Sequence, residues 1–363
     1  MSETDSQTAR RARIVVSWWC PPSLPAGSSS LTRSIRHCVR SPRSLGDHRY
    51  LQPHAKLARL PRWSSLHTRP LTNDRSPATR QIFCLDWNCT GSQLATGSSD
   101  QSVKVWKLDK ASSRSLTLES DLRSHSDSVM YLRFHPSEPD KLASTSGREK
   151  SLKFWDTRAA KNTATLSTPG NNLYFAWSHD GNYIVVGNQK DVVCTVDVRK
   201  MSIINQVEYK YQVNEPVFLR DQLLLGTGKH GSALEFVSFP QMEHIASFVG
   251  HTASVLSVAV DPSGRYVASG GGDALVCLWD AQEDALVNVK TFYHMENPIR
   301  AISFSHDSRY LTMSGDDACL YMEDLVDGLS ETIDLKASVE ESSWNPASRI
   351  MAYPQNDSLF LIY

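Results

Sequence analysis

Two short strings in the sequence contain the residue types of a serine hydrolase triad. Ser178-His179-Asp180 and Ser305-His306-Asp307 each place a hydroxyl, an imidazole and a carboxylate side by side. A working triad requires these side chains to converge from separate segments, whereas neighbours in a tight turn point apart. Both strings therefore indicate turns, and we assign no catalytic residue.

Phosphate-binding and metal-binding patterns also fail on their spacing. Gly226-Thr227-Gly228-Lys229 lacks the earlier glycine and the following Ser or Thr of a phosphate loop. His125 and His251 have no other ligands beside them at zinc spacing, and Cys84 and Cys89 are interpreted as separate thiols. We therefore predict a protein that is not an enzyme, with no metal, cofactor or small-molecule substrate.

The composition divides the chain into a basic beginning and an acidic remainder. Residues 1–80 carry 13 Arg and one Lys against four acids, whereas residues 81–363 carry 24 basic and 35 acidic side chains. The seven cysteines form no CxxC pair, which is typical of a reduced intracellular protein. The apolar run 14–20 is far too short for a membrane helix, so we predict no membrane partner.

Residues 1–75 are predicted to be a disordered Arg/Ser-rich arm, because their composition cannot bury enough apolar surface to offset ordering. A mistaken start site or a retained intron would give the same composition. Clustered arginines could instead add weak, salt-sensitive RNA affinity. Within or near this arm, residues 63–71 are the candidate for an outer strand that closes the domain that follows.

A repeat of about 40 residues fills the chain from residue 81 onward. Each unit has a short strand that ends in an apolar anchor, then a tight turn with Asn, Asp, Pro or Gly, and two further strands. The seven anchors are Trp87, Phe134, Trp177, Leu219, Val260, Phe304 and Trp344. This period predicts an all-β, seven-bladed propeller over residues 81–363.

The repeat resembles the WD40 repeat family. Trp155-Asp156 and Trp279-Asp280 end third strands, and Gly250-His251 opens the unit that Trp279 closes. The resemblance implies a structural hydrogen-bond network that links loop, strand and turn within a blade. Its expected members are His251, Ser269, Asp273 and Trp279 in the fifth unit, His125, Thr145, Glu149 and Trp155 in the second, and Thr96, Asp100 and Trp106 in the first.

Several strings are similar to the family of WD-repeat subunits (subunit 3) of the THO complex. They include Tyr209–Glu215, Asp273–Asp280 and Pro298–Asp307, in the order and spacing of that family. The resemblance implies a nuclear scaffold that binds other THO subunits and mRNA export factors, supports mRNP assembly and export, and contacts RNA indirectly. Ser76–Arg80 departs from the Gly-His opening of that family, so closure of the ring stays open.

Two further patterns concern protein partners. The loops that enter each first strand are polar and are candidate partner-binding surfaces; their representatives are Asp127, Asn171, Glu215, Ser254, Asn297 and Glu340. The ending Trp155-Asp156-Thr157-Arg158 resembles the WDxR motif of cullin-RING ligase substrate receptors. That resemblance implies the alternative function, a WD40 substrate receptor of a ubiquitin ligase.

Overall fold

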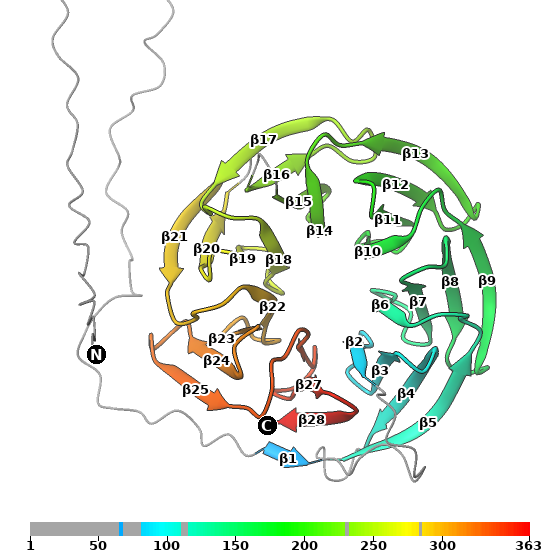
Figure 1. The fold of residues 1–363 in the computed structure, drawn as a ribbon, viewed down its shortest axis with the longest axis horizontal. Coiled ribbons are helices and arrows are strands. Elements are labelled where there is room, and N and C mark those ends of the chain that lie inside the picture. The colour runs from blue at the N-terminus through cyan, green and yellow to red at the C-terminus, as the bar shows by residue number, and fades with distance from the viewer. Residues whose placement is uncertain (1–64, 68–80, 110–114, 229–231, 283–284) are drawn as a thin grey trace, which may run out of the picture. The chain divides into compact units, whose positions relative to one another are not determined.

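The computed structural model describes residues 65–67, 81–109, 115–228, 232–282 and 285–363, which all belong to one compact unit, His54–Tyr363. Throughout these ranges the regular elements are β-strands, arranged in seven sheets of four strands each. The sheets follow one another around a ring, with one strand of each sheet innermost (Figure 1). The predicted all-β, seven-bladed propeller is therefore confirmed.

The strands of each blade are named from the centre of the ring outward. The inner strands are β2 (Ile82–Trp87), β6 (Val129–Phe134), β10 (Asn172–Trp177), β14 (Gln212–Leu219), β18 (Val255–Val260), β22 (Ile299–Phe304) and β26 (Ser343–Trp344). The second strands are β3 (Gln93–Ser98), β7 (Lys141–Ser146), β11 (Tyr183–Asn188), β15 (Gln222–Gly228), β19 (Tyr266–Gly271), β23 (Tyr310–Gly315) and β27 (Met351–Gln355). The third strands are β4 (Ser102–Leu108), β8 (Ser151–Asp156), β12 (Val192–Asp197), β16 (Ala233–Val237), β20 (Val276–Ala281), β24 (Cys319–Asp324) and β28 (Ser358–Ile362).

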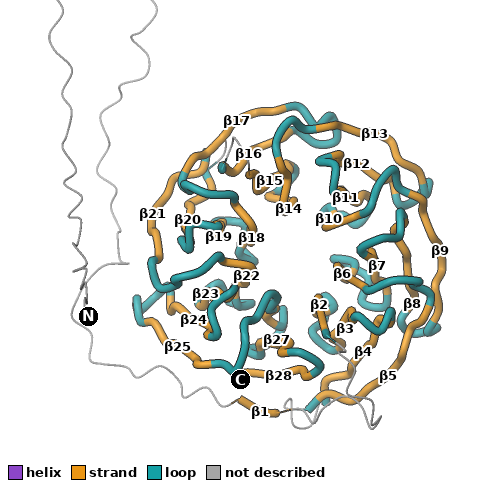
Figure 2. Tube along the Cα trace, viewed as in Figure 1, coloured by secondary structure: helices purple, strands orange, loops and turns teal. Residues whose placement is uncertain are grey.

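The outer strands complete blades 1 to 7 in chain order, and in the described residues no helix interrupts the strands and loops (Figure 2). They are β5 (Leu116–Arg123), β9 (Lys161–Ser167), β13 (Ser202–Glu208), β17 (His244–Val249), β21 (Leu286–Phe292), β25 (Ser330–Asp334) and, for blade 7, β1 (Ser65–His67). Within the same ranges we find no helix that is long and apolar enough to cross a membrane.

Burial follows the position of a strand in its blade. Every residue of β12, a third strand, is buried, whereas β9, an outer strand, alternates between exposed and half-buried residues. Neighbouring blades share their apolar cores: Trp155 of blade 2 packs in one cluster with Val103 and Val105 of blade 1. The apolar faces of each sheet are thus covered by the next sheet around the ring, which removes them from water.

Side chains of the turn after each inner strand fix the hairpin that follows. In blade 5, Asp261 Oδ1 accepts hydrogen bonds from the backbone N–H groups of Arg265 (2.8 Å) and Tyr266 (2.6 Å). Gly264 lies at φ +69°, a left-handed conformation that residues with a Cβ rarely adopt. These turns therefore have a structural task that explains their composition.

Blade 4 differs from the predicted pattern at its anchor. Phe218 pairs with Leu223, the second residue of β15, as Trp87 pairs with Leu94 of β3. The anchor position is therefore occupied by Phe218, and Leu219 lies one residue beyond it. The cause is a tighter hairpin, because Leu219 still pairs with Gln222 across Arg220 and Asp221.

Blade 7 is completed by a strand from the other end of the chain. Ser65, Leu66 and His67 of β1 pair antiparallel with Ile362, Leu361 and Phe360 of β28. The N-terminal strand thus covers the outer edge of β28 and joins both ends of the ring. Apart from these three residues, the segment 63–71 and the predicted disordered arm, residues 1–75, lie outside the described residues.

Candidate functional site

Blade 5 contains a buried chain of hydrogen bonds between a loop, a strand and a turn. His251 Nδ1 lies 3.1 Å from Asp273 Oδ1, and His251 Nε2 lies 2.8 Å from Ser269 Oγ. The Trp279 indole N–H donates to the same Ser269 oxygen at 2.9 Å. Asp273 also accepts from the Thr252 backbone N–H, at 2.7 Å. The contacts are all internal, so the geometry is that of a structural tie.

Blade 2 has the same arrangement with Glu149 in place of the aspartate. His125 Nδ1 lies 2.5 Å from Glu149, and His125 Nε2 lies 2.7 Å from Ser144 Oγ, to which Trp155 Nε1 donates at 2.8 Å. Burial lowers the pKa of His125, which keeps the ring neutral. Although burial opposes ionisation of Glu149, hydrogen bonds from Ser126 and His125 lower its pKa to about 2.

The prediction that Thr145 supplies the hydroxyl of the blade 2 network is wrong. Thr145 pairs with Leu152, whereas Ser144 pairs with Lys153, as Ser269 pairs with Cys277 in blade 5. Between the last paired residues the hairpin connection is one residue longer in blade 2, residues 146–151, than in blade 5, residues 271–275, so counting back four residues from Glu149 gives Thr145. Because side chains alternate along a strand, that residue lies on the opposite face. Its hydroxyl is buried and has no partner among the described residues.

Blade 1 retains only part of this network. The Trp106 indole N–H donates to Thr96 Oγ1 at 3.0 Å. Asp100 accepts from the Ser102 hydroxyl at 2.5 Å and pairs with Lys104 at 3.0 Å. Lys104 thus supplies a cationic partner for the aspartate, and hydrogen bonds from Ser102 and Lys104 outweigh burial and lower its pKa.

The two Ser-His-Asp strings form turns and contain no Ser–His contact. The Ser305 hydroxyl donates directly to Asp307 at 2.6 Å and accepts from the Tyr310 backbone N–H at 2.9 Å. His306 Nδ1 is buried, with no partner in the described part of the chain. The Ser178 hydroxyl likewise lies 2.6 Å from Asp180. Neither serine is positioned for activation by a histidine.

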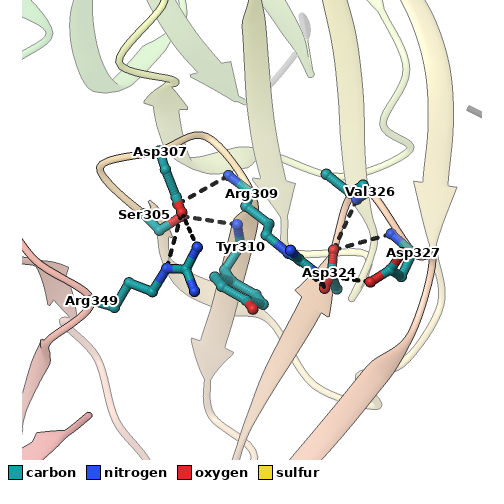
Figure 3. Close-up of polar contacts among 8 residues, drawn as sticks. All are labelled: Ser305, Asp307, Arg309, Tyr310, Asp324, Val326, Asp327 and Arg349. Carbon is teal, nitrogen blue, oxygen red and sulfur yellow. Dashed lines mark hydrogen bonds and ion pairs between the residues drawn. The ribbon is translucent and has the colours of Figure 1, made fainter. Parts of the chain in front are cut away.

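Ion pairs surround the second of these turns and join two blades. Figure 3 shows Arg349 of blade 7 directed at Asp307 of blade 6, with Arg309 directed at Asp324 and Asp327. The closest N–O distances are 2.8 Å for Arg349–Asp307, 2.7 Å for Arg309–Asp324 and 2.6 Å for Arg309–Asp327. Each guanidinium is matched by carboxylates, so this cluster ties strands and turns together.

The glycine-rich string and the other residues that could have supported chemistry are also structural. Thr227 Oγ1 donates to the Ala233 carbonyl at 3.0 Å, and Lys229 lies outside the described residues. Cys84, Cys89, Cys194, Cys277 and Cys319 are free thiols. No group of three or more potential metal ligands gathers within the described ranges.

The predicted partner-binding loops separate into two groups. Asp127, Asn171, Ser254, Asn297 and Glu340 lie in the loops before inner strands, where Asn297 and Glu340 are exposed and the other three half-buried. Glu215 was wrongly placed in this group, because it lies inside β14. Its carboxylate accepts from the Val258 backbone N–H of blade 5 at 2.8 Å and from the Tyr131 hydroxyl of blade 2 at 3.2 Å.

Glu215 belongs to a cavity of about 600 Å³ that residues of all seven inner strands line. Arg133 of blade 2 lines this cavity, with its guanidinium 4.2 Å from the Tyr131 ring centroid and 3.4 Å from the Glu341 carboxylate. Asp86 of blade 1 accepts from the Phe134 backbone N–H of blade 2 at 2.7 Å. We call this cavity the channel, and we call five of its lining residues the channel cluster: Asp86, Tyr131, Arg133, Glu215 and Glu341.

The channel cluster combines burial with like charges. Burial raises the pKa of Asp86 to about 6 and, with the nearby carboxylates Glu215 and Asp86 adding to it, that of Glu341 to about 7. Burial also raises the pKa of Glu215, against the attraction of Arg133. The Arg133 and Glu341 side chains, which line the cavity, are only 25% and 18% exposed. Within the cluster the Tyr131 hydroxyl donates to Glu215, so these polar side chains are bound to one another.

Sequence reasoning missed Asp86, Tyr131 and Arg133. The available signal was a charged residue directly before the apolar anchor, in Asp86-Trp87 and Arg133-Phe134. A charge in an otherwise apolar inner strand requires a partner, and the partners come from other blades.

The WDxR ending of blade 2 presents one exposed side chain, that of Arg158. Asp156 Oδ1 accepts from the Ala159 backbone N–H at 2.8 Å and thereby shapes the turn after β8. The same turn occurs after β12, where Asp197 accepts from the Lys200 backbone N–H at 2.9 Å and Arg199 is exposed.

Comparison with known proteins agrees with the geometry. The family model "WD domain, G-beta repeat" matches residues 70–107, 116–156, 242–280 and 286–322. THO complex subunit 3 of Arabidopsis thaliana is 31% identical over 298 residues, which cover 81% of this chain and 91% of that protein. WD repeat-containing protein AAC3 of Dictyostelium discoideum is 28% identical, over 61% of this chain and 50% of its own length. Pre-mRNA-processing factor 19 homolog 2 of Arabidopsis thaliana is 26% identical, over 74% of this chain and 49% of its own length.

Proposed function

Because the chain belongs to the WD40 repeat proteins and, among them, to the THO complex subunit 3 family, we propose that it is a non-enzymatic scaffold subunit of a THO-type complex. In this role it supports co-transcriptional mRNP assembly and nuclear mRNA export. Its partners are other subunits of the complex and export factors, its contact with RNA is indirect, and it acts in the nucleus.

The observation that carries this proposal is the extent of the match to THO complex subunit 3. The similarity at 31% identity covers 91% of that protein, so it includes blades that the family model of the repeat leaves unmatched. Blades 3 and 4 have diverged from the repeat pattern, and Val196 stands in blade 3 where other blades have tryptophan. Similarity across divergent blades supports a relation to one branch of the family.

The geometry supports a scaffold because the polar side chains of the repeat are used internally. The histidine, carboxylate and hydroxyl side chains of the networks in blades 2 and 5 bind one another within their blade. Such buried, mutually bonded side chains rigidify the ring and leave the loops as the variable surface. A rigid ring can hold several partners at fixed positions without bond chemistry.

Affinity purification of the tagged chain from nuclear extract, followed by mass spectrometry, tests the proposal. We expect recovery of the large THO subunits and, by microscopy, a nuclear location of the tagged chain. Recovery of a cullin adaptor without THO subunits would instead support the ubiquitin ligase alternative.

The exposed Arg158 separates these two functions further. If the chain is a ubiquitin ligase receptor, Arg158→Ala abolishes binding of the adaptor. The same substitution is expected to leave THO assembly unaffected. Arg199→Ala is the matched control, because Arg199 occupies the same turn in blade 3 without the preceding tryptophan. Arg158→Ala is preferable to a change at Asp156, which would remove the hydrogen bond to Ala159 and disturb the turn.

A further inference from the structure

Each blade ends in an outer strand whose outward edge pairs with no other strand of the described residues. Such an edge can template pairing with another chain, and proteins protect it with charged side chains or by keeping the strand very short. Most outer strands of this ring are protected in one of these ways. β5, β9, β13, β21 and β25 each contain Lys, Arg, Asp or Glu, and β1 has only three residues.

The outer strand of blade 4, β17, has neither protection. It is six residues long, His244–Val249, and contains no Lys, Arg, Asp or Glu. From Ile245 to Val249 exposed and half-buried residues alternate, so that Ile245, Ser247 and Val249 share one exposed face of the strand. Ile245 and Val249 are 45% and 75% exposed. Figure 1 shows β17 on the outer rim of the ring, between β13 and β21.

The rim on both sides of β17 is apolar as well. In blades 3, 4 and 5 a bulge leaves one residue of the outer strand out of the pairing, and these residues are Ile204, Ile245 and Val289. Bulges re-aim side chains, and the three residues are 43%, 45% and 51% exposed. The same position carries Glu119 in blade 1 and Thr163 in blade 2. Blade 4 is thus the middle of an apolar part of the rim.

The exposed face of β17 is complementary to a second copy of itself. A two-fold axis at Ser247 places this residue opposite Ser247 of the other copy, and it places Ile245 opposite Val249. Each residue from Ile245 to Val249 then has a partner, and residues of the exposed face meet only residues of the same face. Pairs of β-branched side chains stabilise a sheet, and in this pairing no like charges stand opposite each other.

We infer that the chain forms a symmetric dimer through the outer edge of β17. The two β17 strands pair antiparallel about the axis at Ser247, which joins the four-stranded sheets of blade 4 edge to edge. Repulsion between the two acidic rings is small at physiological salt, because exposed charges more than about 8 Å apart are largely screened. The dimer is a property of the chain alone, and it stands whether or not the chain assembles with THO subunits.

A cysteine at the two-fold axis tests the pairing register. Opposite residues of antiparallel strands have Cα atoms about 4.5–5.5 Å apart, which a disulfide can bridge. Ser247→Cys should therefore give a disulfide-linked dimer when the purified full-length chain is mildly oxidised. Thr165→Cys is the matched control, because the exposed Thr165 of β9 pairs with Lys153 as Ser247 pairs with Glu235. It should give no more linked dimer than the wild type, whose own cysteines set the background.

Sedimentation equilibrium of the full-length chain measures the association itself. We expect the mean molar mass to rise from that of one chain toward that of two as the concentration increases. Ser247→Lys should weaken dimerisation about tenfold or more, because it places two ammonium groups opposite each other. Thr165→Lys, its control, should leave the dimer intact, and thermal unfolding verifies that the variants are folded. A chain that is monomeric at every concentration, equal dimerisation by wild type and Ser247→Lys, or equal disulfide linking by the two cysteine variants would overturn the inference.

Discussion

At the scale of single residues, Ser144 is the hub of the buried network in blade 2. Its hydroxyl donates to His125 Nε2 and accepts from Trp155 Nε1, at 2.7 and 2.8 Å. Because both partners are buried, loss of the hydroxyl leaves two polar groups unsatisfied. The adjacent Thr145 is as deeply buried, but its hydroxyl bonds to none of the described residues.

We therefore expect two neighbouring substitutions to differ in their effect on stability. Ser144→Ala should lower the free energy of unfolding by about 1–3 kcal/mol, the cost of unpaired buried polar groups. Thr145→Val keeps the shape and removes a hydroxyl that makes no bond, so its effect should stay within about 0.5 kcal/mol. The shift of the urea midpoint measures both. Equal destabilisation by the two changes would contradict the assignment of Ser144 to the network.

The pH dependence of stability should report the channel carboxylates. The pKa of Glu341 rises from 4.5 to about 7 on folding, so between these values the folded state binds more protons than the unfolded state. Stability from this group is therefore fully present below about pH 4.5 and is lost as the pH rises through about 7. Glu341→Gln removes this loss of about 1–3 kcal/mol and keeps an acceptor beside Arg133.

Thermal unfolding between pH 5 and pH 8 measures this effect. We expect the melting temperature of Glu341→Gln to rise relative to that of the wild type as the pH increases. Glu340→Gln, a change at the exposed neighbouring residue, should show a constant difference. A difference for Glu341→Gln that does not vary with pH would show that the carboxylate is not the group that titrates.

At the scale of elements, the sequence predicts what each repeat does by itself. The turns after the inner strands have local signatures, such as Asp261 with Gly264, and their hydrogen bonds are made within about five residues. Strand identity follows for the same reason. Errors arose where turn length varies: one extra residue after β7 moved the expected hydroxyl to Thr145, and the tight hairpin of blade 4 moved the anchor to Phe218.

Pairing between the two ends of the chain is weakly encoded in sequence. Only three residues of β1 pair with β28, and nothing in a three-residue string specifies a partner almost 300 residues away. The pairing is understood from the other side: without it, β28 would present an unpaired edge, and closed rings avoid such edges.

Deletion of β1 should therefore weaken blade 7 selectively. A chain that lacks residues 1–71 loses the partner of β28, and we expect faster hydrogen exchange of β28 amides and a melting temperature lower by about 2–6 °C. Deletion of residues 1–53 alone keeps β1 and provides the control. If both truncated chains exchange at the same rate in β28, then β1 does not stabilise the ring.

At the scale of the whole molecule, the channel cluster exists only once the ring is closed. Asp86 bonds to the next blade, Glu215 reaches blades 2 and 5, and Glu341 of blade 7 meets Arg133 of blade 2. Each residue is a single charge in its own strand, and the sequence cannot show which charges meet across a ring. This is why Arg133 escaped prediction although the blade that carries it was predicted correctly.

The division of charge along the chain yields a last prediction about RNA. Residues 81–363 carry 24 basic against 35 acidic side chains, so the ring repels phosphates, whereas residues 1–53 carry eight Arg against three acids. Direct RNA binding by the full chain should then be weak, depend on residues 1–53, and fall steeply with salt, because it depends on release of counterions.

Fluorescence anisotropy of a labelled single-stranded RNA, measured across salt concentrations with the full chain and with the chain lacking residues 1–53, separates the contributions. We expect the deletion to remove most of the low-salt binding and to leave the melting temperature unchanged, since β1 remains. If the shortened chain binds RNA as tightly as the full chain, residues 54–363 contact RNA directly, and the indirect role proposed for this subunit is wrong.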